Sequence, residues 1–130
     1  MTSIQPNIRV LIVDDMAQVR RDLRTVLPLA GQAAGMEIDI VGEAGNGQEA
    51  IQQAAALRPD VVLMDLEMPV MSGYEATRQI KACSPDCRVI ALTIHGDETV
   101  RQKAIQAGVD DFIVKGAPIT SVIQAMAKEE

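Results

Sequence analysis

Four apolar runs of this chain each end in a polar side chain that can bind phosphate or a metal ion. In chain order these side chains are Asp14 with Asp15, Asp65, Thr93 and Lys115. In an open parallel sheet, ligands bind in the crevice outside the carboxyl ends of the strands. If the four runs are strands of one such sheet, three carboxylates, a hydroxyl group and an ammonium group meet at one edge.

This set of groups is suited to a metal ion and a phosphoryl group. Carboxylates held close together repel one another, and a divalent cation offsets that repulsion. Mg²⁺ prefers oxygen ligands and commonly binds one or two carboxylates together with phosphate, an arrangement that suits phosphoryl transfer. Asp65 can then act as a nucleophile that forms an aspartyl phosphate, while Lys115 and Thr93 bind phosphoryl oxygens.

The elements that must position these residues alternate regularly along the chain. Apolar runs predict strands at 8–13, 38–41, 61–64, 88–92 and 111–114. Helical periodicity and capping signals predict helices at 16–27, at 46–57, from 72 onward, at 97–107 and from 118 onward. Strict alternation of this kind predicts an α/β fold, with a parallel sheet, right-handed crossovers and helices on both faces.

Local signals mark several helix ends and buried faces. Asn46 and Ser72 are expected N-caps, each followed three residues later by a glutamate, and Gly108 is expected to end the fourth helix. Buried stripes are expected on the first and last helices, at Val19, Leu23, Val26 and Leu27 and at Ile119, Val122, Ile123 and Met126.

Pro28 interrupts the pattern of the first helix. Proline has no backbone N–H and clashes with the preceding turn, so it breaks or kinks a helix interior. We therefore expect the regular helix to end near Leu27, and residues 29–35 to form a kinked extension or an extra turn.

The bulk composition limits the class of protein. A length of 130 residues allows one domain with a proper core, and an aromatic content of 2% makes that core aliphatic. A net charge of −6 without a basic patch argues against non-specific binding to nucleic acid or membrane surfaces. The sequence shows no targeting segment or apolar run long enough for a membrane span, which predicts a soluble, cytoplasmic chain with no membrane partner.

Cys83 and Cys87 flank a short loop. They are either a redox pair, half of a metal site, or two unrelated thiols. No second pair of cysteine or histidine residues completes a metal site, which favours unrelated thiols.

Taken together and in order, the strand-end motifs resemble the receiver domains of bacterial two-component response regulators. The resemblance covers essentially the whole chain. Its motifs are Val13-Asp14-Asp15, Met64-Asp65-Leu66-Glu67-Met68-Pro69 with Gly73, Leu92-Thr93 and Phe112-Ile113-Val114-Lys115. It implies a single flavodoxin-like (βα)5 doubly wound domain over residues 1–130, with strand order 2-1-3-4-5.

The resemblance also implies the metal ligands. Asp65 matches the phospho-acceptor and a metal ligand. Asp15 matches the direct carboxylate ligand, and Asp14 acts partly through water. The backbone carbonyl of Glu67 completes the protein's share of the coordination of Mg²⁺ or Mn²⁺.

The switch residues follow in the same way. Thr93 matches the hydroxyl that moves toward the phosphoryl group, Phe112 the aromatic ring that follows it, and Lys115 the active-site lysine. Glu67 and His95, two residues beyond Asp65 and Thr93, occupy positions that tune the lifetime of the phosphoryl group.

The implied partners are a sensor histidine kinase and a second copy of the chain after phosphorylation. The switched surface consists of the helix at 97–107, the strand at 111–114 and the final helix. Gly116 replaces the proline that usually follows the lysine, which resembles receivers fused to LuxR-type DNA-binding domains and puts a cis peptide bond in doubt. DNA would then be bound only through a C-terminal output domain absent from this chain; the alternative is a free-standing receiver. Neither turns over an external substrate as an ordinary enzyme does.

Plainer interpretations exist for each residue considered alone. Asp14 and Asp15 can stabilise a helix N-terminus, Thr93 can be an ordinary strand-end residue, and Lys115 and His95 can be solvated loop residues. Phe112, the only phenylalanine, can belong to the core.

Two other functions use similar chemistry or topology. A magnesium-dependent phosphatase with an aspartyl-phosphate intermediate usually has its nucleophile on the first strand and a second acid two residues later, which differs from Asp14-Asp15. A flavin-binding electron carrier needs a phosphate loop rich in glycine and hydroxyl groups after the first strand, and the acids there have the opposite character.

Overall fold

Five parallel strands form one sheet in the order β2-β1-β3-β4-β5. The computed structural model describes residues 7–128. The strands are β1 (Asn7–Val13), β2 (Glu37–Ala44), β3 (Val61–Asp65), β4 (Arg88–Thr93) and β5 (Asp111–Val114), and the helices are α1 (Ala17–Ala33), α2 (Gly47–Leu57), α3 (Gly73–Cys83), α4 (Glu98–Ala107) and α5 (Ile119–Ala127). The predicted doubly wound fold and strand order are confirmed. Within residues 7–128, no helix is both long enough and apolar enough to cross a membrane.

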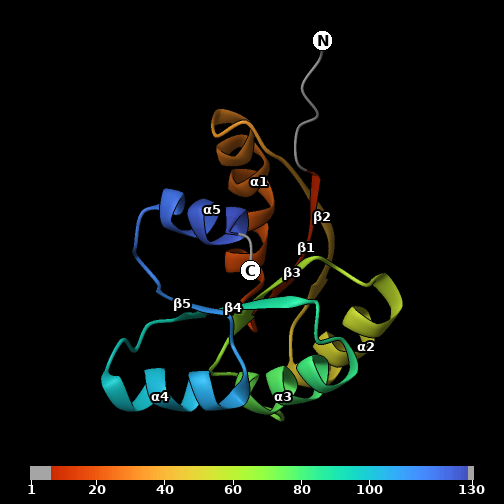
Figure 1. The fold of residues 1–130 in the computed structure, drawn as a ribbon, viewed down its shortest axis with the longest axis vertical. Helices are drawn as coiled ribbons and strands as arrows, with labels where there is room; N and C mark the ends of the chain where they lie inside the picture. The colour runs from red at the N-terminus through yellow and green to blue at the C-terminus, as the bar shows by residue number, and fades with distance from the viewer. Residues whose placement is uncertain (1–6, 129–130) are drawn as a thin grey trace.

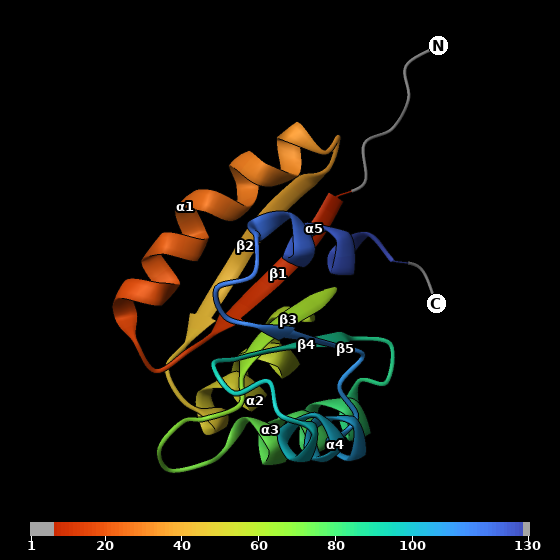
Figure 2. The same ribbon diagram turned by 90° about the vertical axis from the view of Figure 1, so that its left-hand side faces the viewer.

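The helices cover the sheet in two layers, with α1 and α5 on one face and α2, α3 and α4 on the other (Figures 1 and 2). Each central strand contributes alternate residues to the two layers, as the two-residue period of a strand requires. In β1, Val10 and Ile12 pack toward α1 and α5, whereas Leu11 and Val13 pack toward α2, α3 and α4. A strand that is apolar on both faces leaves only its end free for polar side chains.

The predicted helix caps at Asn46 and Ser72 are confirmed. The Asn46 side chain accepts a hydrogen bond from the Glu49 N–H at 2.9 Å, and Ser72 accepts one from the Glu75 N–H at 3.3 Å. Gly108 ends α4 with a φ of 108°, a left-handed conformation that suits glycine.

Strand β2 is longer than predicted, because its ends are polar. It pairs with β1 along its whole length, with an irregularity between Val10 and Leu11. The strand lies at the edge of the sheet, where Glu37 is exposed and Gly42 and Glu43 are only partly buried, so an apolar run underestimates its length.

The expectation that α1 ends near Leu27 is wrong. The helix continues through Pro28 to Ala33, because Leu27 and Gly31 on either side of the proline are both buried. Gly31 packs so closely on β2 that a Cβ atom there would lie 2.7 Å from the Ile38 side chain. Val26, expected in the buried stripe, is 40% exposed, since the contact face lies on the side of Leu27.

Replacing Pro28 with alanine should stabilise the protein. Alanine restores the N–H that a helix interior uses and removes the clash with the preceding turn, while the unfolded chain gains some entropy. We expect a net gain of about 1–2 kcal/mol in the free energy of unfolding, measured by urea denaturation. Leu29→Ala, at the neighbouring exposed position, is the control, and a loss of stability in Pro28→Ala would show that the proline is needed.

Candidate functional site

The structure brings three of the predicted carboxylates together at the carboxyl end of the sheet. Asp14 and Asp65 are buried, whereas Asp15 is exposed. One oxygen from each of the three lies within 4.8 Å of the others. The donor set consists entirely of carboxylate oxygens, which are the ligands that Mg²⁺ and Mn²⁺ prefer, so the residues present fit such an ion.

Asp65 is the last residue of β3, and the loop that follows it is closely packed. Its Oδ1 accepts a hydrogen bond from the Glu67 N–H at 3.1 Å. The Gly73 N–H donates to the Leu66 carbonyl at 3.1 Å, and a Cβ atom at Gly73 would collide with the backbone carbonyl of Asp65. Only glycine at position 73 allows this approach of α3 to the end of β3.

Burial raises the pKa of Asp65 to about 6, and the charges of Asp14 and Asp15 act in the same direction. The hydrogen bond from the Glu67 N–H and the charge of Lys115 oppose this shift without cancelling it. The ionised carboxylate of Asp65 is therefore held at an energetic cost, and added positive charge at the site reduces that cost.

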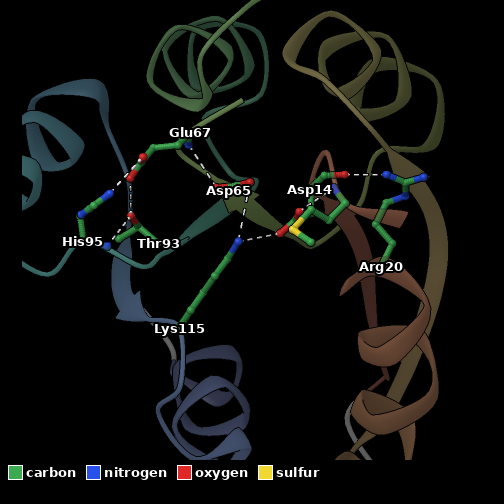
Figure 3. A network of polar contacts seen from close by, with 8 residues as sticks. Asp14, Arg20, Asp65, Glu67, Thr93, His95 and Lys115 are labelled. Carbon is green, nitrogen blue, oxygen red and sulfur yellow. Dashed lines mark hydrogen bonds and ion pairs between the residues drawn. The ribbon is translucent and has the colours of Figure 1, made fainter. Parts of the chain in front are cut away.

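Lys115 supplies positive charge from the end of β5. Its Nζ donates a hydrogen bond to Asp14 Oδ2 at 2.9 Å and lies 3.7 Å from Asp65 Oδ2 (Figure 3). Burial alone would lower the pKa of Lys115, but the hydrogen bond to Asp14 and the charge of Asp65 outweigh burial and raise it. The ammonium group stays protonated between the two buried acids.

Thr93, at the end of β4, lies on the side of Asp65 away from Asp14, and its hydroxyl group both donates and accepts a hydrogen bond (Figure 3). The hydroxyl donates to Glu67 Oε1 at 3.2 Å and accepts from the His95 N–H at 3.1 Å. His95 Nε2 in turn lies 3.3 Å from Glu67 Oε2. The two positions predicted to tune the phosphoryl lifetime therefore contact each other and hold the predicted switch hydroxyl.

Phe112 is not part of this polar network. It is partly buried and packs against the layer of α2, α3 and α4, and the guanidinium of Arg101 on α4 lies over its ring at 5.8 Å from the centroid. This placement is compatible with either a core role or a switch role.

Gly116 follows the lysine in a loop with a φ of 99°. Among residues 7–128 every peptide bond is trans, so the cis bond that the Gly116 replacement put in doubt does not occur.

The sequence did not predict the contacts that arginines of α1 make with the loop carrying Asp14 and with β2. Arg20 of α1 reaches the backbone carbonyl of Asp14, and both Arg20 and Arg24 bind Glu43 of β2. Their four-residue spacing on α1 is visible in the sequence, but the partner on β2 depends on the tertiary structure.

The two cysteines form no disulfide. Cys83 is exposed and Cys87 is buried, and both are free, in agreement with unrelated thiols. They line a surface hollow of about 750 Å³ beside the first residue of β4, at the sheet edge opposite to Thr93 and the carboxylates.

Comparisons with known proteins agree with this geometry. Residues 10–127 match the family model described as "Response regulator receiver domain". The chain is 38% identical over 120 residues to the chemotaxis protein CheY of Thermotoga maritima, covering 92% of this chain and 95% of that protein. It is also 38% identical to the response regulator GacA of Pseudomonas viridiflava, covering 92% of this chain but only 53% of that protein, so it spans about half of that relative.

The fold also resembles solved structures. A two-component response regulator of the LuxR family from Aurantimonas sp. SI85-9A1 superposes with a TM-score of 0.82 at 29% identity, covering 91% of this chain and 81% of that one.

In the metal-free protein, the contribution of Asp65 to stability should fall as the pH rises from about 4 to 6. The carboxyl group of Asp65 titrates at about 6 in the folded state and near its ordinary value of 3.8 when unfolded. In this window the native state binds more protons than the unfolded state, so the free energy of unfolding falls as the pH rises. Relative to wild type, Asp65→Asn should therefore gain about 1–3 kcal/mol between pH 4 and pH 7.5.

Urea unfolding in EDTA at several pH values measures this difference. Asp39→Asn, which changes an exposed aspartate on β2, controls for the loss of one carboxylate. A stability difference between Asp65→Asn and wild type that is the same at pH 4 and pH 7.5 would contradict the raised pKa.

Proposed function

The chain belongs to the response regulator receiver family, and from this premise we propose that Asp65 accepts a phosphoryl group from the phosphohistidine of a sensor histidine kinase in the presence of Mg²⁺ or Mn²⁺. The observation that carries the proposal is the position of Asp65. It is a buried carboxylate at a strand end, beside two further acids and a protonated lysine. A signalling role in a phosphorelay follows from the family.

In the transfer step, a carboxylate oxygen of Asp65 forms a bond to phosphorus. The bond between phosphorus and the imidazole nitrogen of the kinase breaks, and its electron pair returns to the imidazole ring, which takes up a proton. Asp65 Oδ1 is held by the Glu67 N–H, while Oδ2 faces Lys115. Lys115 Nζ lies 3.7 Å from Asp65 Oδ2, and Thr93 ends the neighbouring strand β4. We assign to both side chains the binding of phosphoryl oxygens.

The metal ligands of the proposal are Asp15, Asp65 and the backbone carbonyl of Glu67, with Asp14 acting partly through water. When bound, the cation offsets the negative charge that accumulates on the transferring group. The closeness of the three carboxylates supports this assignment.

Phosphorylation would act on the face formed by α4, β5 and α5. The Thr93 hydroxyl has one proton, which it donates to Glu67 in this structure, so binding a phosphoryl oxygen requires release of Glu67. Phe112 would respond to that movement and shift an existing equilibrium of the face. Ile105 of α4 and Val114 of β5 are exposed apolar side chains, and Ile94, also exposed, lies in the loop that leads to α4. Exposed apolar side chains suit binding to a second copy or an output domain.

The proposed output is regulation of transcription through a DNA-binding domain that follows residues 1–130. Gly116 and the likeness to a LuxR-family response regulator support it, and the match to only 53% of GacA from Pseudomonas viridiflava is consistent with a further domain. The alternative, a free-standing receiver that acts only through protein contacts, is supported by the near-complete coverage of CheY from Thermotoga maritima. Sequencing the gene beyond the Glu130 codon decides between them, and the cytoplasmic location expected from the sequence stays a prediction.

Acetyl phosphate with Mg²⁺ should add one phosphoryl group to the protein, detected by intact mass spectrometry. Asp65→Asn and wild type in EDTA should remain unmodified, because one lacks the nucleophile and the other lacks the cation that offsets the charge. Gain of the group by Asp65→Asn would place the acceptor elsewhere. Sustained release of phosphate from a generic phosphate ester would favour a phosphatase.

Removing the Glu67 side chain should speed this phosphorylation. Glu67→Ala frees the Thr93 hydroxyl from a competing hydrogen bond. It also removes a negative charge near the incoming phosphate, and both effects should increase the rate of phosphorylation. We expect a rate increase of about 2- to 10-fold, the range of one hydrogen bond. His95→Ala keeps the Glu67 contact with Thr93 and serves as the control; a slower Glu67→Ala would contradict the competition.

A further inference from the structure

An arginine of α1 holds the loop that carries Asp14 and Asp15. Arg20 Nη1 donates a hydrogen bond to the backbone carbonyl of Asp14 at 2.6 Å (Figure 3). Its Nε donates to Glu43 Oε1 at 3.1 Å. The guanidinium, whose side chain is 21% exposed, therefore joins the loop after β1 to strand β2.

Each polar atom of Asp14 has a partner, and Arg20 provides one of the four. The Asp14 N–H donates to the Ala44 carbonyl at 3.1 Å, Oδ1 accepts from the Met16 N–H at 2.9 Å, and Oδ2 accepts from Lys115. In the first two contacts the partner of Asp14 is a backbone group, of Ala44 on β2 and of Met16. The third partner, Lys115, also faces Asp65. The fourth polar atom, the Asp14 carbonyl oxygen, is the one that accepts its hydrogen bond from a side chain of α1, that of Arg20.

The Asp14 carbonyl also determines where Asp15 lies. A peptide unit is planar, so fixing this oxygen fixes the direction of the bond to the Asp15 nitrogen and the position of its Cα. In the part of the chain that the structure describes, Asp15 makes no side-chain hydrogen bond or ion pair. Its placement near Asp14 and Asp65 therefore depends on its backbone.

We propose that Arg20 is a positioning residue for divalent-cation binding: by holding the Asp14 carbonyl, it orients the peptide unit that directs the Asp15 carboxylate toward the carboxylates of Asp14 and Asp65. This inference rests on the proposed function, in which these carboxylates bind the cation.

Geometry and charge make opposite predictions for removal of Arg20. A loss of positive charge near a cation site should strengthen cation binding, whereas a loosened peptide unit should weaken it. Glu43 already pairs with Arg20, which reduces the net charge effect. Arg24 also binds Glu43, at 2.6 Å, without contacting Asp14, so Arg24 offers a matched change of charge that leaves the carbonyl contact intact.

The experiment is a calorimetric titration of the metal-free chain with Mg²⁺. Arg20→Met should raise the Kd about 5- to 10-fold, toward the lower end of the range for residues that orient metal ligands. Arg20→Lys, which keeps a donor and the charge, should recover part of the affinity. Arg24→Met should stay within about 2-fold of wild type, because its partner does not touch the ligands.

A second readout separates positioning from a general loss of structure. At saturating Mg²⁺, Arg20→Met should be phosphorylated by acetyl phosphate at close to the wild-type rate, with the defect confined to the concentration of Mg²⁺ required. A merely structural role would lower the melting temperature in EDTA and leave the Kd unchanged. If Arg20→Met is unstable, Arg20→Lys alone tests the affinity.

Failure of the proposed role of Arg20 can be told apart from failure of the proposed phosphorylation of Asp65. An unchanged or lower Kd in Arg20→Met, or an equal rise in Arg24→Met, would overturn the role of Arg20 while the phosphorylation of wild type still supports a receiver. Failure of wild type to bind Mg²⁺ and to be phosphorylated on Asp65 would overturn both.

Discussion

The site depends on one electrostatic constraint: two buried carboxylates lie at the same sheet edge and need positive charge between them. Asp14 is 2% exposed and Asp65 is 4% exposed, so water screens their repulsion poorly. Lys115 is hydrogen-bonded to the first and faces the second. The charge of Lys115 does not fully offset the burial of Asp65 and its repulsion by Asp14, because the pKa of Asp65 remains raised. The site is therefore built to gain stability from a further cation.

The sheet determines where this constraint can arise. The residues of β3 from Val61 to Met64 are fully buried between two helical layers, and a charge within that stretch would have neither solvent nor partner. Asp65 follows at the point where the strand leaves the sheet. The parallel arrangement places the ends of β1, β4 and β5 beside it, so groups distant in sequence become neighbours without any direct link between their loops.

The same features explain which parts could be predicted from the sequence. Strand-end polar residues follow from alternation and from the rule that parallel strands share their carboxyl edge, and Asp65 and Lys115 were found in this way. The path of α1 through Pro28 depends on the fit of Gly31 against Ile38, a tertiary contact that outweighs local propensity. The polar ends of β2 were missed because pairing with β1, and not burial, keeps them in the strand.

The contacts of Thr93 could not be read from the sequence for a different reason. The strand-end position predicted that Thr93 lies near Asp65, and the resemblance to receiver domains added Glu67 and His95. Neither says which oxygen accepts the Thr93 hydroxyl proton. In the structure the proton goes to Glu67 Oε1, so the resting state satisfies the hydroxyl internally. In the proposed switch this hydrogen bond must break before the Thr93 proton can bind a phosphoryl oxygen, so the contact with Glu67 contributes to the free-energy difference between the two states. Glu67 thus contacts Thr93 through its side chain and Asp65 through its backbone N–H, so one residue connects the proposed acceptor to the proposed switch hydroxyl.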